Sequence, residues 1–161
     1  MTSKNLYTGI LDFANVQYIS GEDHVKISER SKVDNGDILF AMIGSIGNPV
    51  IIDTDIEFSI KNVALFKYYN ANTINNNYLY RYLLFAQEKM KEMSSGAVQK
   101  FVSLGFLRSF LLPLPPLNEQ ERIVEKINQL MVLCDDLEKQ IENSSSKQTQ
   151  LLNAIMSNLG K

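Results

Sequence analysis

The sequence offers few residues whose types and spacing could do chemistry. It has one histidine, His24, and one cysteine, Cys134, so neither a transition-metal site nor an internal disulfide is expected. It lacks the GxxxxGK[ST] loop that binds nucleotide phosphates, and it lacks the cofactor loop and Asn/Asp-Pro-Pro-aromatic motif of a methyltransferase. The carboxylates are scattered and form no acid/base pair. These absences favour a binding protein that catalyses nothing.

Some polar side chains suit the recognition of nucleic acid. Arginine and lysine can pair with guanine, and asparagine and glutamine with adenine, when they project from loops or helix ends. For each such side chain the alternative is an ordinary solvated surface residue. The candidates are Ser95, Gln99 and Lys100 in the loop 94–100, Lys61 and Asn62 beside Ser59 between two predicted strands, and Lys26, Arg30 and Lys32 for phosphate contacts.

The overall charge does not indicate a nucleic-acid binder. The formal net charge is −2, whereas such proteins usually carry a basic footprint. The part before Leu117 is neutral and the remainder is slightly acidic. Any affinity for DNA must therefore come from the placement of individual charges or from a partner.

The first half of the chain predicts short strands. A turn signal at 34–37 leads into the apolar segment 37–43, and the glycines and proline of 44–49 interrupt it. Because the turns are close together, hairpins are more natural than βαβ crossovers. The predicted strands are Val16–Ile19, His24–Ile27, 37–43, Val50–Ile52 and Val63–Phe66.

The second half predicts helices, so the fold class is expected to be α+β. Asn75–Asn77 can cap a helix that runs to about Met93, with Leu79, Leu83, Ala86, Met90 and Met93 on its buried face. The aromatic residues Tyr78, Tyr80 and Tyr82 are interpreted as core and rim and not as base-stacking platforms. Prolines at 113, 115 and 116 enforce an extended backbone. A second helix is expected from the N-cap Asn118 to Asn143, weakened by Ser144–Ser146.

Apolar residues of this second helix recur in alternating steps of four and three, which is a heptad pattern. At 1.5 Å per residue the helix would be about 39 Å long, too long to be covered by a domain of this size. We therefore expect a partner helix. The heptad seam consists of Ile123, Ile127, Leu130, Cys134, Leu137 and Ile141.

The segment Leu112–Val124, with the sequence LPLPPLNEQERIV, resembles the junction of type I restriction–modification specificity subunits. In that family a P-L-P-P-x-x-E-Q-x-x-I-V string marks the handover from a target-recognition domain to a long helix. The segments GDILF…IGSIG (36–47), SGAVQK…VSL (95–104) and LLNAIM (151–156) are similar to the same family. The match covers almost the whole chain, and the junction is its specific part.

The resemblance implies a target-recognition domain at residues 1–117 and a dimerisation and spacer helix at 118–161. Specificity subunits carry two such domains, each reading one half of a split double-stranded DNA target, on an antiparallel coiled coil. Methylase and motor-nuclease subunits dock on them, and S-adenosylmethionine, ATP and Mg belong to those partners. The chain itself is expected to need no cofactor, to catalyse nothing, and to be cytoplasmic without contact to a membrane.

The sequence departs from the family plan in three ways. It has one domain and one helix, so a homodimer through the helix would restore the layout and imply a palindromic target. Its start at Met1 is consistent with missing opening elements of the domain. Met42 stands where relatives often carry arginine, which weakens the case for a phosphate contact at the 44–47 turn. The alternatives are a coiled-coil adaptor that binds no DNA, and the recognition tail of a fused restriction–methylation enzyme.

Overall fold

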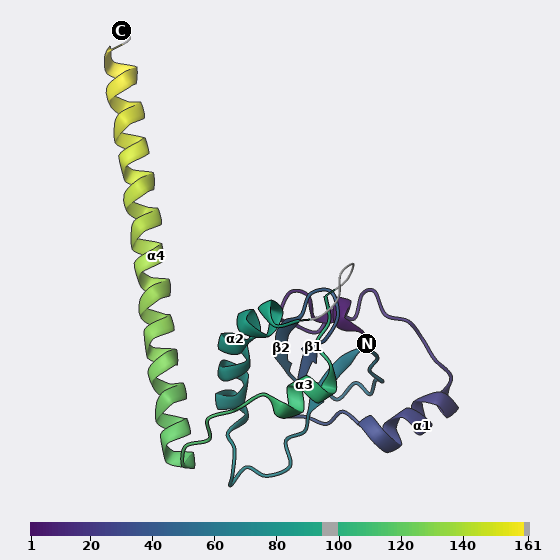
Figure 1. The fold of residues 1–161 in the computed structure, drawn as a ribbon. Coiled ribbons are helices and arrows are strands. Elements are labelled where there is room, and N and C mark those ends of the chain that lie inside the picture. The colour runs from purple at the N-terminus through teal and green to yellow at the C-terminus, as the bar shows by residue number, and fades with distance from the viewer. Residues whose placement is uncertain (95–99, 160–161) are drawn as a thin grey trace. The chain divides into compact units, whose positions relative to one another are not determined.

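The computed structural model describes residues 1–94 and 100–159, and the chain divides into two compact units. The first unit, Met1–Glu121, holds a three-stranded sheet with its covering helices, and the second begins at Arg122 within a long helix. Figure 1 shows the elements of each unit. This mixture of a small sheet and helices confirms the α+β class.

The sheet has the strand order β2-β1-β3, with β1 at Ile38–Ala41, β2 at Gly47–Ile51 and β3 at Val63–Phe66. Both pairings are antiparallel, as the close turns predicted. The turn before β1 closes with the Asp37 amide donating to the Asp34 carbonyl at 3.1 Å. All four residues of β1 are buried because the strand is central and both faces of the sheet are covered.

Each face of the sheet packs on its own apolar cluster. Ile38 and Phe40 face α2 (Asn76–Glu92), whose Leu83, Ala86 and Met90 are buried against them. Leu39 and Ala41 point the other way and pack with Leu6, Val50 and Val63. Leu6 belongs to the short 3-10 helix η1 (Ser3–Leu6). Alternate residues of one strand thus serve two cores.

Two of the predicted strands are wrong. His24–Ile27 lies within the helix α1 (Gly21–Ser31), and Val16–Ile19 forms no strand. The Ser20 hydroxyl caps α1 by accepting from the Asp23 amide at 3.1 Å, and Glu22 and Asp23 occupy the first turn. This capping chemistry outweighs a four-residue alternation. The predicted interruption of the strand at 44–49 is shorter than expected and covers only 44–46, because β2 already begins at Gly47.

The predicted helix from Asn75 is confirmed as α2, but Met93 lies just past its end and is exposed. The short helix α3 (Leu104–Ser109), capped by Ser103, was missed. The long helix α4 runs without interruption over Leu117–Leu159, and so continues through Ser144–Ser146, where a weakening was predicted. Asn118 is not its N-cap, because the helix begins at Leu117 and the Pro116 carbonyl already accepts from the amides of Glu119 and Gln120.

Candidate nucleic-acid interface

Lys61 and Asn62 form an exposed turn that leads into β3. Their backbone is held by the N-terminus, since the Lys61 amide donates to the Met1 carbonyl at 2.9 Å and the Ser3 hydroxyl donates to the Asn62 carbonyl at 2.8 Å. Asn62 has a φ of 60°, a left-handed conformation that asparagine tolerates. The segment therefore has a structural role, and both side chains remain exposed.

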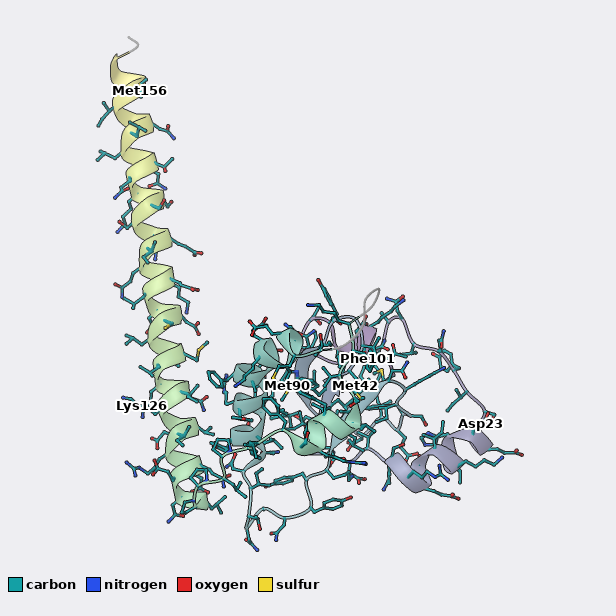
Figure 2. All side chains as sticks on the ribbon, in the orientation of Figure 1. Asp23, Met42, Met90, Phe101, Lys126 and Met156 are labelled. Atoms are coloured by element: carbon teal, nitrogen blue, oxygen red, sulfur yellow. The ribbon has the colours of Figure 1, made fainter. Side chains whose placement is uncertain are left out.

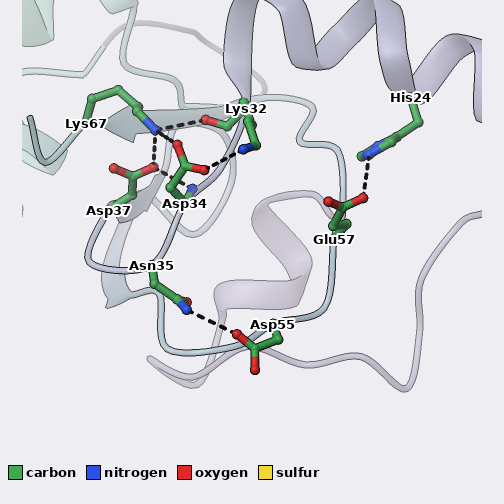
Figure 3. Close-up of polar contacts among 8 residues, drawn as sticks. All are labelled: His24, Lys32, Asp34, Asn35, Asp37, Asp55, Glu57 and Lys67. Atoms are coloured by element: carbon green, nitrogen blue, oxygen red, sulfur yellow. Dashed lines mark hydrogen bonds and ion pairs between the residues drawn. The ribbon is translucent and has the colours of Figure 1, made fainter.

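Lys26, Arg30 and Lys32 lie on or just after α1, a helix with no buried residue. Lys26 and Arg30 are exposed. The Lys32 ammonium pairs with the Asp34 carboxylate at 3.1 Å (Figure 3), so its charge is largely compensated. Of the three predicted phosphate contacts, Lys26 and Arg30 are therefore better candidates than Lys32.

The Lys32–Asp34 pair continues into a network around Lys67, and Figure 3 shows the contacts of Lys67 with Lys32, Asp34 and Asp37. The Lys67 ammonium lies 2.6 Å from Asp34 and 2.7 Å from the carboxylate of Asp37, whose side chain is 1% exposed. Asp37 also accepts from the backbone amides of Asp34 and Tyr68, each at 2.8 Å. These bonds join the start of β1 to the end of β3, so the network is structural.

The ionisation of this network follows from its contacts. The hydrogen bond from Lys67, followed by that from Lys32, lowers the pKa of Asp34. Burial alone would lower the pKa of Lys67, but its hydrogen bonds and charge interactions with Asp34 and Asp37 raise it above the usual value. Both partners are therefore held in their charged forms.

Lys100 lies beside the glycine turn Gly44–Asn48. The Gly44 amide donates to the Lys100 carbonyl at 3.2 Å, and the Val102 amide donates to the Met42 carbonyl at 2.9 Å. A cavity of about 480 Å³ lies beside this turn and is lined by the turn, by Lys100, by Lys91 of α2 and by Tyr7. Ser95 and Gln99, the other candidates of this loop, lie outside the described residues.

Met42 contributes to the core and not to a surface. It packs against the apolar cluster that contains Met90, and Figure 2 places Met42, Met90 and Phe101 in the same region. Lys91 and Tyr7 lie beside this turn only because of tertiary contacts between segments far apart in the sequence. Neither residue is therefore among the candidates predicted from the sequence.

The junction between domain and helix is fixed by Gln120, whose side chain is 0% exposed. Its Oε1 accepts from the Asn75 amide at 2.8 Å, and its Nε2 donates to the carbonyls of Pro115 at 2.8 Å and Thr73 at 3.1 Å. The amide that it satisfies belongs to Asn75, the N-cap of α2, and not to its own helix. The first turn of α4 is thereby part of the domain.

The proline segment before α4 is held by tyrosine hydroxyls. Tyr78 donates to the Pro113 carbonyl at 2.8 Å, and Tyr82 donates to the Leu111 carbonyl. Prolines carry no amide hydrogen, so only carbonyls of such a segment can be bonded. Burial raises the pKa of Tyr78. Two of the three tyrosines thus anchor the junction, in keeping with their interpretation as core and rim.

The heptad seam is exposed along most of its length. Ile123 and Ile127 are half-buried, whereas Leu130 is 48%, Leu137 49% and Ile141 68% exposed, and Cys134 is a free, exposed thiol. Figure 2 shows side chains projecting from α4 on all sides along its length. The same heptad register continues through Ser144 and Gln148 to Leu151 and Ile155. Four further positions therefore extend the seam, two of them polar.

The described residues hold neither a metal-binding cluster nor a membrane-spanning helix. Among residues 1–94 and 100–159, no group of three or more His, Cys, Asp or Glu side chains is placed to hold a metal ion. None of the described helices is long and apolar enough to cross a membrane.

Comparison with known proteins agrees with the resemblance of the junction. Residues 3–144 match the family described as "Type I restriction modification DNA specificity domain". The matched range includes the whole domain, the proline junction and most of α4.

Individual relatives carry the same description. The chain is 29% identical over 92% of its length to the type I restriction enzyme EcoBI specificity subunit of Escherichia coli, covering 31% of that protein. It is 36% identical over 55% of its length to the EcoAI specificity subunit of Escherichia coli, covering 16%. It is 24% identical over 91% of its length to the StySPI specificity subunit of Salmonella potsdam, covering 35%. The chain thus spans about a third or less of these relatives.

Proposed function

Since this chain belongs to the family of type I restriction–modification DNA specificity domains, we propose that it is one recognition half of a specificity subunit. In this role the domain reads one half-site of double-stranded DNA and directs methylase and motor-nuclease subunits to the target. The match across domain, junction and helix is the observation that carries the proposal. S-adenosylmethionine, ATP and Mg are proposed to be held by the partner subunits, with no catalytic step on this chain.

The proposed assembly is a homodimer through α4. Leucine and isoleucine side chains that are half exposed or more, at heptad spacing on a 43-residue helix, favour burial against a second helix. A second copy of the chain supplies an identical seam, and the two-fold symmetry of such a pair implies a palindromic target. The family layout implies that the two helices run antiparallel.

An antiparallel register follows from maximal overlap. A two-fold axis beside Lys139 places every position of the extended seam opposite another, with Leu137 facing Ile141 and Ile123 facing Ile155. The same axis places Cys134 of one copy opposite Ser144 of the other. A shift by one heptad in either direction leaves seam residues at an end unpaired.

The cysteine tests this orientation. In the Ser144→Cys variant, mild oxidation should give a covalently linked dimer, while the unchanged chain, whose only cysteine is Cys134, should stay unlinked. Efficient linking of the unchanged chain would indicate a parallel pair with Cys134 facing its own copy. A chain that is monomeric at tens of micromolar by sedimentation would remove the homodimer altogether.

The recognition role is tested by methyl transfer. A type I methylase subunit that co-purifies with this chain is assayed with and without it, and S-adenosylmethionine-dependent methylation of a mixed-sequence DNA pool is measured. Methylation at one motif, only in the presence of the chain, is expected. Identical methylation with and without the chain would contradict the role.

A further inference from the structure

The cavity beside the glycine turn has the chemistry of an anion site. It lies where segments far apart in the sequence meet, namely the turn Gly44–Asn48, the last turn of α2 with Lys91, and Lys100, which precedes the bridge residue Phe101. Its volume is about 480 Å³, and it is open to solvent at exposed Tyr7. Such a space admits a phosphodiester group together with part of its sugars.

The walls of the cavity are held in place by the fold. The Asn48 amide donates to Oε1 of Gln87 on α2 at 2.9 Å. Gly47 has a φ of 106°, and a Cβ there would collide with the Gln87 side chain, so only glycine lets the turn approach α2 this closely. On the other side, the antiparallel bridge between Ile43 and Phe101 fixes the backbone next to Lys100. The cations therefore stand on a preformed frame.

The charge of the lining is positive. Lys91 and Lys100 line the cavity together with the hydroxyl-bearing residues Tyr7 and Ser45 and with Asn48, and among the described residues no Asp or Glu belongs to the lining. Lys91 lies 2.6 Å from Glu88, three residues earlier on α2. Glu88 is well exposed, and pairs of this kind on a helix surface are weak and readily exchanged for a better anion. Two cations with neutral donors and no lining acid select a negatively charged oxygen group.

We propose that this cavity binds a backbone phosphate of double-stranded DNA, with Lys91 and Lys100 as its cationic contacts. The assignment rests on the proposed recognition function and adds a phosphate-positioning site to it. A phosphate contact raises the affinity for every sequence and carries no base information. Lys100 accordingly sets the position of the DNA, and base reading falls to other side chains.

The test measures how the affinity of the chain–methylase complex for duplex DNA depends on salt. Each phosphate neutralised contributes about 0.9 to the slope of log affinity against log salt. The double variant Lys91→Ala/Lys100→Ala should lower that slope by about 1 and weaken binding about tenfold at low salt. The loss should be equal for target and non-target DNA, and the methylated motif should stay the same.

The matched control is Lys89→Ala, an exposed lysine on the same helix that does not line the cavity. It should leave the slope unchanged. Ser45→Glu, which adds a negative charge to the lining, should weaken binding at least as much as the double variant. Melting curves of all variants should superimpose on that of the parent, since Lys100 is exposed and Lys91, although half-buried, is paired only with the exposed Glu88.

Three results would overturn the inference. Unchanged affinity and slope in the double variant would show that no phosphate is bound there. A changed motif would assign base reading to the cavity. Inorganic phosphate that displaces DNA from the complex much more strongly than chloride at matched ionic strength would identify a small-anion site instead. The proposal predicts that the two salts displace DNA equally. If the parent complex binds no DNA, the recognition function itself fails, which is a separate outcome.

Discussion

Gln120 and Leu130 lie on the same helix, yet their surroundings are opposite. Gln120 is completely buried, and both ends of its amide are hydrogen-bonded to the domain, whereas Leu130 is 48% exposed. Among the described residues no buried side-chain polar atom lacks a hydrogen-bond partner, and the domain holds two buried apolar clusters. The helix beyond Arg122 exposes an apolar seam at heptad spacing. The difference separates a first turn that is built into the domain from a seam that we propose is buried by a partner helix.

Among the changes that test this difference, those to the heptad seam should have the largest effect, which is on the dissociation constant of the dimer. Leu130→Glu with Leu137→Glu should turn the dimer into a monomer, because each buried leucine contributes about 1.5 to 3 kcal/mol and the pair occurs in both copies. The dissociation constant should rise by more than about a thousandfold. Sedimentation at a series of concentrations measures it.

The control for the seam is Val132→Glu. Val132 is 61% exposed and lies on the side of α4 away from the seam. It should leave the dimer intact. If Val132→Glu separates the copies as strongly as the seam variant, the interface has been assigned to the wrong face.

Removal of Lys67 should come next and should act only on the domain. Lys67→Met leaves the buried Asp37 carboxylate without its cation and should lower the free energy of unfolding by about 3 kcal/mol. The two backbone amides that still bond Asp37 keep the cost from being larger. Urea unfolding measures this loss of free energy, and an unchanged midpoint would show that the Lys67 network does not stabilise the fold.

The same network predicts a pH dependence. The pKa of Asp34 is lowered in the folded chain, so its contribution is fully present above the ordinary value of 3.8 and is lost as the pH falls through the lowered folded value. The parent should therefore lose stability below about pH 4, and Lys67→Met should show a flatter acid limb. Parallel acid limbs in the two proteins would contradict the assignment.

Gln120→Leu should have a smaller effect on stability. The change leaves the Asn75 amide and the carbonyls of Pro115 and Thr73 without their partner, at a cost of about 2 kcal/mol. Dimerisation should persist because the seam is untouched. Gln120→Glu keeps the acceptor for Asn75 but loses the donor, and it should also destabilise the chain. A neutral result for both variants would mean that the junction is loose.

Lys32→Ala should have the smallest effect. Its pair with Asp34 is exposed to solvent and screened, so its loss should hardly change the stability. If Lys32 touches no phosphate, the salt dependence of DNA binding should stay at the parental value, while Lys26→Ala and Arg30→Ala should each lower it. A lowered slope for Lys32→Ala would restore Lys32 as a phosphate contact.

The regular elements with strong local signals were predictable, and those set by long-range contacts were not. Strand β1 follows a clear turn and an apolar run, and α2 follows a cap. Helix α1 was mistaken for a strand because Val25 and Ile27 alternate with polar neighbours over 24–27, and the helix buries no residue that would mark a core-facing side. The serines 144–146 were predicted from propensity to weaken the second helix, and α4 continues through them.

The residues of the candidate site also differ in whether local sequence could predict them. Lys100 was predicted from its loop, and the junction from its prolines, glutamine and heptads. The partners of Lys100 were not predictable, because Tyr7, Ser45 and Lys91 come together only through pairing of 42–44 with 100–102 and packing of α2. The bonds of Gln120 to the loop before α2 equally depend on the tertiary fold.

The central claim, a paired recognition half that reads DNA, is tested most directly by sequencing the modified bases that the chain and its methylase place in a methylation-free host genome. The account predicts one split motif whose two halves are inverted repeats, since two identical domains read it. It also predicts that the motif disappears with the Leu130→Glu/Leu137→Glu variant. A motif with two unrelated halves, or one that survives the loss of the dimer, would contradict it.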